Sequence, residues 1–416
     1  MDRRSFAATV LGVAAAPLLP RPSCAADPIR IGFGMAQTGP LAANGKSALL
    51  AMEIWRGETN AKGGVLGRQI EFVTYDDQSN PSTVPGIYTK LLDVDKVDLV
   101  VSGYGTNVIA PAMPIVMQHN RTFLSLFGLA VNSQFHYPKY FTITPTGQNA
   151  PIASTIGFFE VGAAQNPAPK TLAIVAADAE YPRTSAEGVR ANAKKFGWQV
   201  VYDKTYPPNT TDFSPIVRAV QATNPDAVFV ASYPLDSVGM VRAANEVGLK
   251  TKLFGGGMVG LQTTSVKLQL GPLLNGIVNY DFWIPAKTMQ FPGVLDFLGK
   301  YQAKAGDAGV DPLGYYLAPW AYTYMQVLAA AVEGAKSLDQ DKIADFLRAN
   351  TFKTVMGDIA FGEDGELSEP RDLMVQYQHI AGNDLDQFKD GKNPIILWPA
   401  KYQDGKALYP YDSARS

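Results

Sequence analysis

The sequence of 416 residues is poor in the side chains that most often carry chemistry. It has one cysteine, Cys24, and only three histidines, which are His119, His136 and His379 and which lack metal-ligand spacing. Neither a Gly-x-Ser-x-Gly nor a His-Glu-x-x-His motif occurs. The net charge of -2 offers no basic surface for nucleic acid. These shortages argue against an enzyme and against a nucleic-acid-binding protein.

Long apolar runs are also scarce, and the one near the start, at 7–19, is too short to span a bilayer. Arg3 and Arg4 precede this run, and small residues follow it up to Ala26. That order is typical of a secretory signal peptide, here 1–26, cleaved after Ala26. The arginine pair fits a twin-arginine export signal or, nearly as well, a general secretion signal.

Cys24 lies inside this predicted signal peptide. A lipid-anchored cysteine normally has a leucine-like residue three positions earlier, where this chain has Arg21, so we expect no acylation. Cleavage after Ala26 leaves an exported protein without cysteine. Such a protein has neither a disulfide nor a thiol nucleophile.

The rest of the chain has the composition of a globular protein, with 46% hydrophobic and 18% charged residues. Short apolar runs alternate with segments of helical periodicity, which predicts an α/β fold with parallel, doubly wound sheets. The first series has strands at 29–35, 69–75, 97–102 and 122–127, with helices at 46–60, 83–94 and 108–119. After a strand-like run at 140–144, a second series has strands at 171–176, 199–206, 226–232 and 252–255, with helices at 183–196, 212–223 and 237–248.

The last part of the chain differs, because a strand-like run at 276–282 leads to helices at 291–304, 313–334 and 339–349. Short strand-like runs near 359, at 373–379 and at 395–398 close the chain. We expect the late helices to return to the first lobe, which is otherwise small for its sheet. This predicts a first lobe of 27–144 and 280–354, and a second lobe of 145–279 with a tail of 355–416. A ligand cleft should lie between the lobes, outside the carboxyl ends of the strands.

Two glycine-containing stretches near the start imitate nucleotide-binding motifs. The loop from Gly39 ends in Gly45-Lys46-Ser47, but five residues separate its glycines where a phosphate loop has four, and Pro40 removes an N–H donor. The stretch 32–37 has Gln37 where a dinucleotide fingerprint has its third glycine. We therefore expect no nucleotide cofactor, and no other cofactor or metal.

Asp76 and Asp77 are the one pair of neighbouring carboxylates that suits acid/base chemistry, but they precede Asn80-Pro81, a turn that commonly starts a helix. We favour a structural role in which one of them caps that helix.

The loops after the predicted strands carry small polar and aromatic residues. The amides of Thr106 and Asn107, at the start of a helix, suit a carboxylate, and this role is compatible with capping the helix. Gly128 follows the fourth strand and lets a ligand approach the backbone. Tyr181 and Tyr233 follow two strands of the second series; each offers a flat ring with a hydroxyl, although either also suits a surface loop.

Four stretches together resemble one known family: 36–45, the turn Asn60-Ala61-Lys62-Gly63-Gly64, the triplet Tyr75-Asp76-Asp77, and Val355-Met356-Gly357. They are similar to the leucine/isoleucine/valine-binding proteins, which are periplasmic substrate-binding proteins of ABC importers, and the resemblance covers 27–381. It implies a type I periplasmic binding fold, with two Rossmann-like lobes joined by three crossovers that close over a ligand. It also implies a periplasmic location and an ABC permease in the inner membrane as partner, and we expect a monomer.

The same resemblance places the ligand. The family's carboxylate-binding hydroxyl matches Thr106, and its second-lobe aromatics match Tyr181 and Tyr233. Its backbone-contact loop matches Phe127, Gly128 and Leu129. The family's disulfide pair would fall on Ser79 and Gly105, so the chain resembles members without that bridge. The loop from Gln37 to Asn44 would form the rim of the cleft.

Two departures from the family bear on the ligand. Leu129 stands where amino-acid binders use a Thr hydroxyl, and Gly257 or Met258 stands where they use a Glu for the ammonium group. A buried ammonium without an acceptor would be costly. Together with the aromatic residues above and Tyr315 or Tyr316, this favours an apolar or aromatic carboxylate, or an amide, with a hydrophobic amino acid as the alternative.

Two other functions stay open from the sequence. An enzyme on a doubly wound fold would need a triad, metal set or phosphate loop, and the sequence offers none. A sensor that reports a ligand to a signalling partner would share the fold, and the residues barely separate it from a transport protein.

Overall fold

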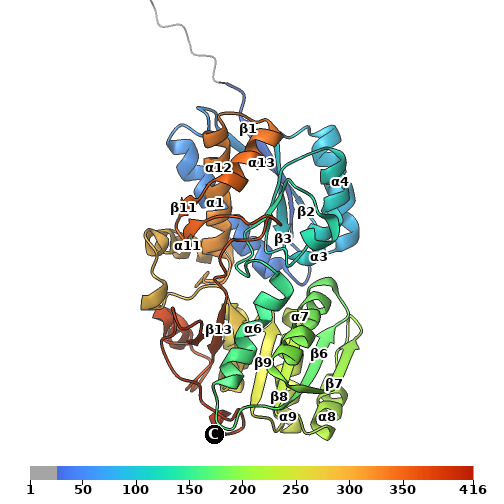
Figure 1. The fold of residues 1–416 in the computed structure, drawn as a ribbon. Coiled ribbons are helices and arrows are strands. Elements are labelled where there is room, and N and C mark those ends of the chain that lie inside the picture. Colours follow the sequence, from blue (N-terminus) through green and yellow to red (C-terminus); the bar gives the residue numbers. More distant parts are fainter. Residues whose placement is uncertain (1–25, 416) are drawn as a thin grey trace, which may run out of the picture.

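The structure, a computed structural model, describes residues 26–415, so the predicted signal peptide up to Ala25 lies outside the described residues. The described chain forms two lobes, each built on its own sheet (Figure 1). The α/β fold that was predicted from the alternation of strands and helices is confirmed. Within residues 26–415, no helix combines the length and apolar character needed to cross a membrane.

The first lobe contains a five-stranded sheet in the order β2-β1-β3-β4-β5, with every neighbouring pair parallel. The strands are β1 (Ile29–Met35), β2 (Ile70–Asp76), β3 (Leu99–Tyr104), β4 (Phe123–Leu126) and β5 (Tyr140–Thr142). Its first helices are α1 (Ala42–Ala61), α2 (Val84–Thr89), α3 (Thr106–Ile109), α4 (Met113–Gln118) and α5 (Asn132–Phe135). β3 and β4 are buried along their whole length because helices cover both faces of the sheet.

The second lobe contains a seven-stranded sheet in the order β14-β13-β10-β9-β8-β6-β7. Its parallel strands are β6 (Thr171–Ala177), β7 (Gln199–Tyr206), β8 (Ala227–Ser232), β9 (Leu253–Met258) and β10 (Val278–Asp281). Two antiparallel strands, β13 (Leu373–Gln376) and β14 (Ile395–Trp398), extend it. Its helices are α6 (Ala150–Ala163), α7 (Glu180–Phe196), α8 (Ser214–Ala222), α9 (Pro234–Val247) and α10 (Thr264–Leu270). Counted along the chain within each lobe, the five parallel strands of both sheets therefore follow the same spatial order, 2-1-3-4-5.

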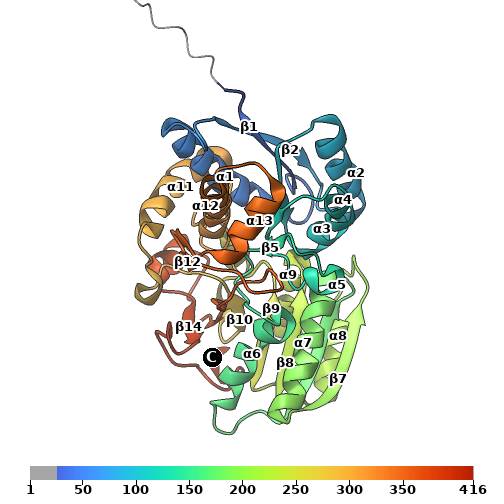
Figure 2. The ribbon, with the colours of Figure 1, turned by 45° about the horizontal axis from the view of Figure 1, so that its top comes forward.

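The late helices α11 (Val294–Ala308), α12 (Ala318–Ala335) and α13 (Gln340–Ala349) lie in the first lobe with the hairpin of β11 (Phe352–Thr354) and β12 (Gly357–Ile359) (Figure 2). Ser47 of α1 shares a 2.7 Å hydrogen bond with Tyr301 of α11. The Tyr324 hydroxyl of α12 accepts from the Ser102 amide of β3 at 2.7 Å. The chain thus crosses between the lobes three times. The expected lobe boundary between residues 279 and 280 falls inside β10 (Val278–Asp281), which pairs within the second sheet. We therefore propose that this boundary lies slightly later in the chain.

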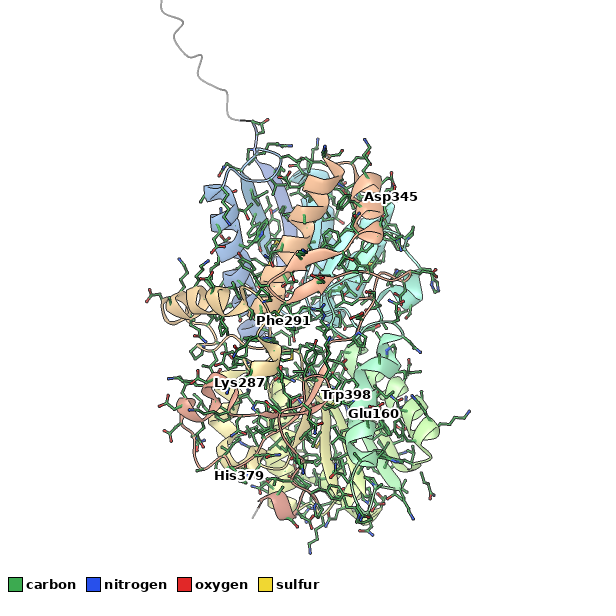
Figure 3. The ribbon with its side chains drawn as sticks, turned by 60° about the vertical axis from the view of Figure 1, so that its left-hand side comes forward. Glu160, Lys287, Phe291, Asp345, His379 and Trp398 are labelled. Carbon is green, nitrogen blue, oxygen red and sulfur yellow. The ribbon has the colours of Figure 1, made fainter. Side chains whose placement is uncertain are left out.

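Helix α6 was missed in the sequence, because residues 145–170 show no clear helical period. It is apolar around most of its surface, since it lies against α7 on one side and β13 and β14 on the other. The Trp398 indole of β14 donates to the Glu160 carboxylate of α6 at 2.6 Å, and the two side chains lie together in Figure 3. The backbones of α6 and α7 approach each other very closely at Gly188 of α7. A Cβ atom at this position would lie 1.7 Å from the Pro151 carbonyl oxygen of α6. Only glycine allows this approach.

Two carboxylates are buried without well-formed partners among the described residues, Glu366 and Asp372. Burial and the nearby Asp364 carboxylate raise the pKa of Glu366 well above its ordinary value of 4.5, and the Ala130 amide offsets only part of this effect. Burial likewise raises the pKa of Asp372.

Replacing Glu366 with glutamine should stabilise the protein more as the pH rises. Well below pH 4.5 the folded and unfolded chains both hold the Glu366 proton. As the pH rises through 4.5 the unfolded chain releases this proton while the folded protein keeps it, so the wild-type protein loses stability. Glutamine does not titrate, so at about pH 8 the free energy of unfolding of Glu366→Gln should exceed that of wild type by roughly 1–3 kcal/mol, the usual cost of an unpaired buried group. Urea unfolding at about pH 5 and pH 8 measures it. Exposed Glu363, replaced in the same way, is the control, and an equal gain at both pH values would contradict the prediction.

Candidate ligand-binding cleft

The carboxyl ends of the parallel strands in the two lobes face each other across a pocket with about 620 Å³ of atom-free space, open mouth included. This is where the 2-1-3-4-5 winding of both sheets leaves a crevice. The loops after β1, β3 and β4 contribute from the first lobe, and those after β6, β8, β9 and β10 from the second. The lining residues are Leu41, Tyr104, Gly105, Thr106, Phe127, Leu129, Thr144, Thr146, Ser154, Tyr181, Ser185, Phe229, Tyr233, Gly257, Val259, Tyr280, Phe282 and Tyr316.

Five of the nine site residues expected from the sequence line this pocket: Thr106, Phe127, Leu129, Tyr181 and Tyr233. Phe127 has a φ of 64°, in the left-handed region that side chains usually avoid. Its ring packs 4.7 Å from that of Phe282, centroid to centroid, which brings the two lobes into contact at the pocket wall. Backbone strain of this kind persists only where the surroundings fix it, and it is common at ligand sites.

Gly128 does not line the pocket, although the sequence suggested that a ligand would approach its backbone. A Cβ at this position would lie 2.5 Å from the Tyr140 hydroxyl and 3.1 Å from the Ser125 hydroxyl. The glycine is therefore needed for packing behind the loop. Met258 is also absent from the lining; it is fully buried in the sheet, while Gly257 and Val259 on either side reach the pocket.

Asn44 and Asn107 lie near the pocket but outside it. Helix α1 starts at Ala42, earlier than expected, so Asn44 falls in its first turn, where its amide donates to the Tyr104 hydroxyl at 3.5 Å. Asn107 lines an open cleft that shares Leu41 and Tyr233 with the pocket, and it accepts from the Tyr181 amide across the lobes at 3.4 Å. Of the predicted rim from Gln37 to Asn44, Leu41 lines the pocket, and Pro40 and Leu41 line the open cleft beside it.

The Asp76–Asp77 pair has a structural role, but not the predicted one. Asp76 accepts from the amides of Gln37 and Thr38 and from the Thr38 hydroxyl, so it holds the loop after β1. Burial raises its pKa, but these hydrogen bonds and one from Gln78 outweigh that effect and lower it. The turn at Pro81 is capped by Asn80, whose side chain accepts from the Ser82 amide.

All the residues that line the pocket are uncharged. Asp281 lies between two lining residues along the chain but is not among them. Burial raises the pKa of Asp281 to about 6, and the buried Lys267 offsets part of that rise. Within residues 26–415, no group of three or more His, Cys, Asp or Glu side chains is placed to hold a metal ion. The pocket therefore offers neutral hydrogen-bonding groups and apolar surface.

Several of these neutral groups are free to donate. The Thr106 hydroxyl accepts from the Leu129 amide at 3.1 Å, which leaves its own proton available. The amide of Thr106, the first residue of α3, has no carbonyl one turn earlier in that helix. The Thr146 hydroxyl is buried and has no partner among the described residues. Donors of this kind suit a carboxylate or amide oxygen.

The aromatic walls are more extensive than the sequence indicated, because eight of the eighteen lining residues are aromatic. Tyr181 and Tyr233 face each other with centroids 6.0 Å apart. Of the pair Tyr315 and Tyr316, only Tyr316 lines the pocket. Four aromatic lining residues were not predicted from the sequence: Tyr104, Phe229, Tyr280 and Phe282. Two of them could have been, because Tyr104 and Tyr280 lie at the ends of strands β3 and β10.

A family model described as "Periplasmic binding protein" matches residues 28–378. The leucine-, isoleucine-, valine-, threonine- and alanine-binding protein of Pseudomonas aeruginosa is 26% identical over 351 residues, covering 83% of this chain and 88% of that protein. A leucine-binding protein from Thermotoga maritima has a TM-score of 0.73 at 19% identity, covering 85% of this chain and 96% of the other. A solute-binding protein from R. palustris, solved with benzoate, has a TM-score of 0.73 at 16% identity, covering 89% and 95%. At these identities the structural likeness establishes the fold.

Proposed function

The chain belongs to the periplasmic binding protein family, and from this premise we propose that it captures a small aromatic or apolar carboxylate, or its amide, and delivers it to an ABC permease. Its relatives are substrate-binding proteins of the leucine/isoleucine/valine type and not enzymes. Members of the family are periplasmic, which fits the export signal expected from the sequence.

The observation that carries the choice of ligand is the uncharged, aromatic lining of the pocket. An amino acid brings an ammonium group, which needs an acidic partner when it is removed from water. No lining residue supplies one, whereas the donors around Thr106 suit an oxygen group. The rings of Phe127, Tyr181 and Tyr233 favour a flat, apolar body. One structural neighbour was solved with benzoate, which supports the same choice.

Titration calorimetry on protein stripped of bound ligand tests the proposal. Benzoate, phenylacetate and benzamide should bind, whereas leucine, isoleucine and valine should bind roughly a hundredfold more weakly, because an unpaired buried ammonium costs about 3 kcal/mol or more. Tight binding of the branched-chain amino acids without binding of any aromatic compound would contradict the proposed ligand class.

The transport role needs a test in cells. A strain that lacks this protein should take up the cognate acid more slowly at low external concentration, and a plasmid copy should restore uptake. Unchanged uptake in the deletion strain would contradict delivery to a permease, even where the ligand is correctly identified.

A further inference from the structure

The last part of the chain lies beyond residues 28–378, which the family model matches, and it is anchored to the second lobe. Its strand β14 pairs with β13 at the edge of the second sheet. The Tyr411 amide donates to the Lys252 carbonyl at 2.9 Å. The Tyr409 hydroxyl donates to the Pro167 carbonyl at 2.7 Å. These contacts fix this part of the chain to one lobe.

The same part of the chain also touches the second crossover between the lobes, residues 282–293, which lead from β10 to α11. The Thr288 hydroxyl of this crossover donates to the Tyr402 carbonyl at 2.8 Å. The backbone at Gly391 lies so close to the crossover that a Cβ there would be 2.9 Å from the Ala286 amide nitrogen. The crossover is therefore held at two points by a segment that belongs to the second lobe.

A third contact of this segment reaches the first lobe. The Asp390 amide donates to the Tyr315 hydroxyl at 3.3 Å. Tyr315 shortly precedes α12, which packs on α1 in the first lobe. Its ring packs against that of Trp283 in the crossover, with the ring centroids 5.8 Å apart. We call residues 385–402 the strap, because they are anchored in the second lobe and contact both the crossover and the approach to α12.

The loop that carries Tyr315 is held by the second lobe at another point as well. Asp311 of this loop accepts from the amide of Thr264, the first residue of α10, at 2.7 Å. It also accepts from the Thr264 hydroxyl at 2.6 Å. The strap and α10 thus hold the same loop from two places on the second lobe.

We propose that the strap restrains the opening of the lobes and thereby slows the release of the captured ligand. Lobes of this architecture open through changes of backbone angle at a few residues of their connections. Bending of the second crossover has to break the contact between Thr288 and Tyr402. Separation of the lobes has to break the contact between Asp390 and Tyr315. Each broken contact adds to the free energy of opening.

Only the slower release rests on the proposed function, because it requires a captured ligand. The restraint on opening concerns the ligand-free protein equally. The two parts of the proposal can therefore be measured separately.

A merely structural role for the strap makes a different prediction. The strap buries Phe388 completely and so adds to the core of the second lobe. If this were its whole contribution, loss of its polar contacts would lower the free energy of unfolding and leave the opening of the cleft unchanged. Opening and stability therefore have to be measured on the same variants.

The test compares wild type with two double variants. Thr288→Val/Tyr315→Phe removes the two hydroxyls that the strap contacts. The matched control, Thr263→Val/Tyr409→Phe, removes one threonine and one tyrosine hydroxyl whose partners lie within the second lobe. Small-angle X-ray scattering gives the radius of gyration of each ligand-free protein. Stopped-flow fluorescence gives the rate of benzoate release, and urea unfolding gives the stability.

We expect ligand-free Thr288→Val/Tyr315→Phe to have a larger radius of gyration than wild type. It should release benzoate roughly tenfold faster, the usual combined effect of two hydrogen bonds. The control variant should match wild type in both measurements.

The outcomes separate the strap from the proposed ligand class. An unchanged radius of gyration in Thr288→Val/Tyr315→Phe would overturn the restraint, and so would an equal increase in the control. A larger radius with release at the wild-type rate would overturn the effect on release. Failure of wild type to bind benzoate would count against the ligand class, and the radius of gyration would still decide whether the strap restrains opening.

Discussion

If the proposed ligand class is correct, replacing Thr106 with valine is expected to weaken binding of benzoate roughly tenfold to a hundredfold, as measured by calorimetry. The hydroxyl accepts from the Leu129 amide and has its proton free to donate into the pocket. A hydrogen bond to a charged group contributes about 1.5–3 kcal/mol, which corresponds to this range. The substitution also leaves the Leu129 amide unpaired, so the backbone loop that faces the ligand should loosen.

Thr205→Val is the matched control for this variant. Thr205 is exposed on β7, an edge strand of the second sheet far along the sheet from β9 and β10. The control should bind the acid as wild type does, and both variants should keep a wild-type circular dichroism spectrum. Wild-type affinity in Thr106→Val would show that the carboxylate binds elsewhere in the pocket.

Replacing Gly188 with alanine is expected to destabilise the protein by roughly 1–3 kcal/mol, the usual cost of overpacking a tight contact. The added methyl group would lie 1.7 Å from the Pro151 carbonyl oxygen, so α6 and α7 would have to separate. Gly299→Ala is the control, because Gly299 lies in helix α11 and a Cβ there meets nothing within 4 Å. Alanine in a helix interior is favoured over glycine by about 0.5–1 kcal/mol, so the control should gain stability. Urea unfolding should show a lower free energy of unfolding for Gly188→Ala and a higher one for Gly299→Ala. Equal changes in the two variants would contradict the close approach of α6 and α7.

The strands were predicted more accurately than the helices. β1 (Ile29–Met35), β7 (Gln199–Tyr206) and β14 (Ile395–Trp398) match the bounds expected from short apolar runs. Helix α6 was missed because it is enclosed on several sides, and an enclosed helix loses the amphipathic period by which helices are recognised. The expected helix at 83–94 is divided in the structure into a 3₁₀ turn, α2 and a π turn, a distinction that periodicity does not resolve.

The pocket was predictable where it depends on single strand ends. Thr106 and Tyr181 directly follow parallel strands or begin the next helix, and the sequence places them in that position. Tyr280 and Tyr316 meet only because the chain returns to the first lobe after β10 and packs α12 on α1. That meeting depends on contacts between residues far apart in the sequence, which local patterns do not encode. Asn44 was misplaced because α1 starts four residues earlier than expected.

The return of the chain to each lobe has a consequence for how the protein is made. During synthesis the first sheet emerges early, yet α11 and α12, which pack on α1, are translated only after most of the second sheet. The second sheet in turn waits for β13, β14 and the closing segment, where Tyr411 packs against Phe254. The first lobe can therefore be completed only after β12 (Gly357–Ile359), and the second only after the closing segment with Tyr411. Each lobe holds part of its apolar surface uncovered while a segment of the other lobe is being made.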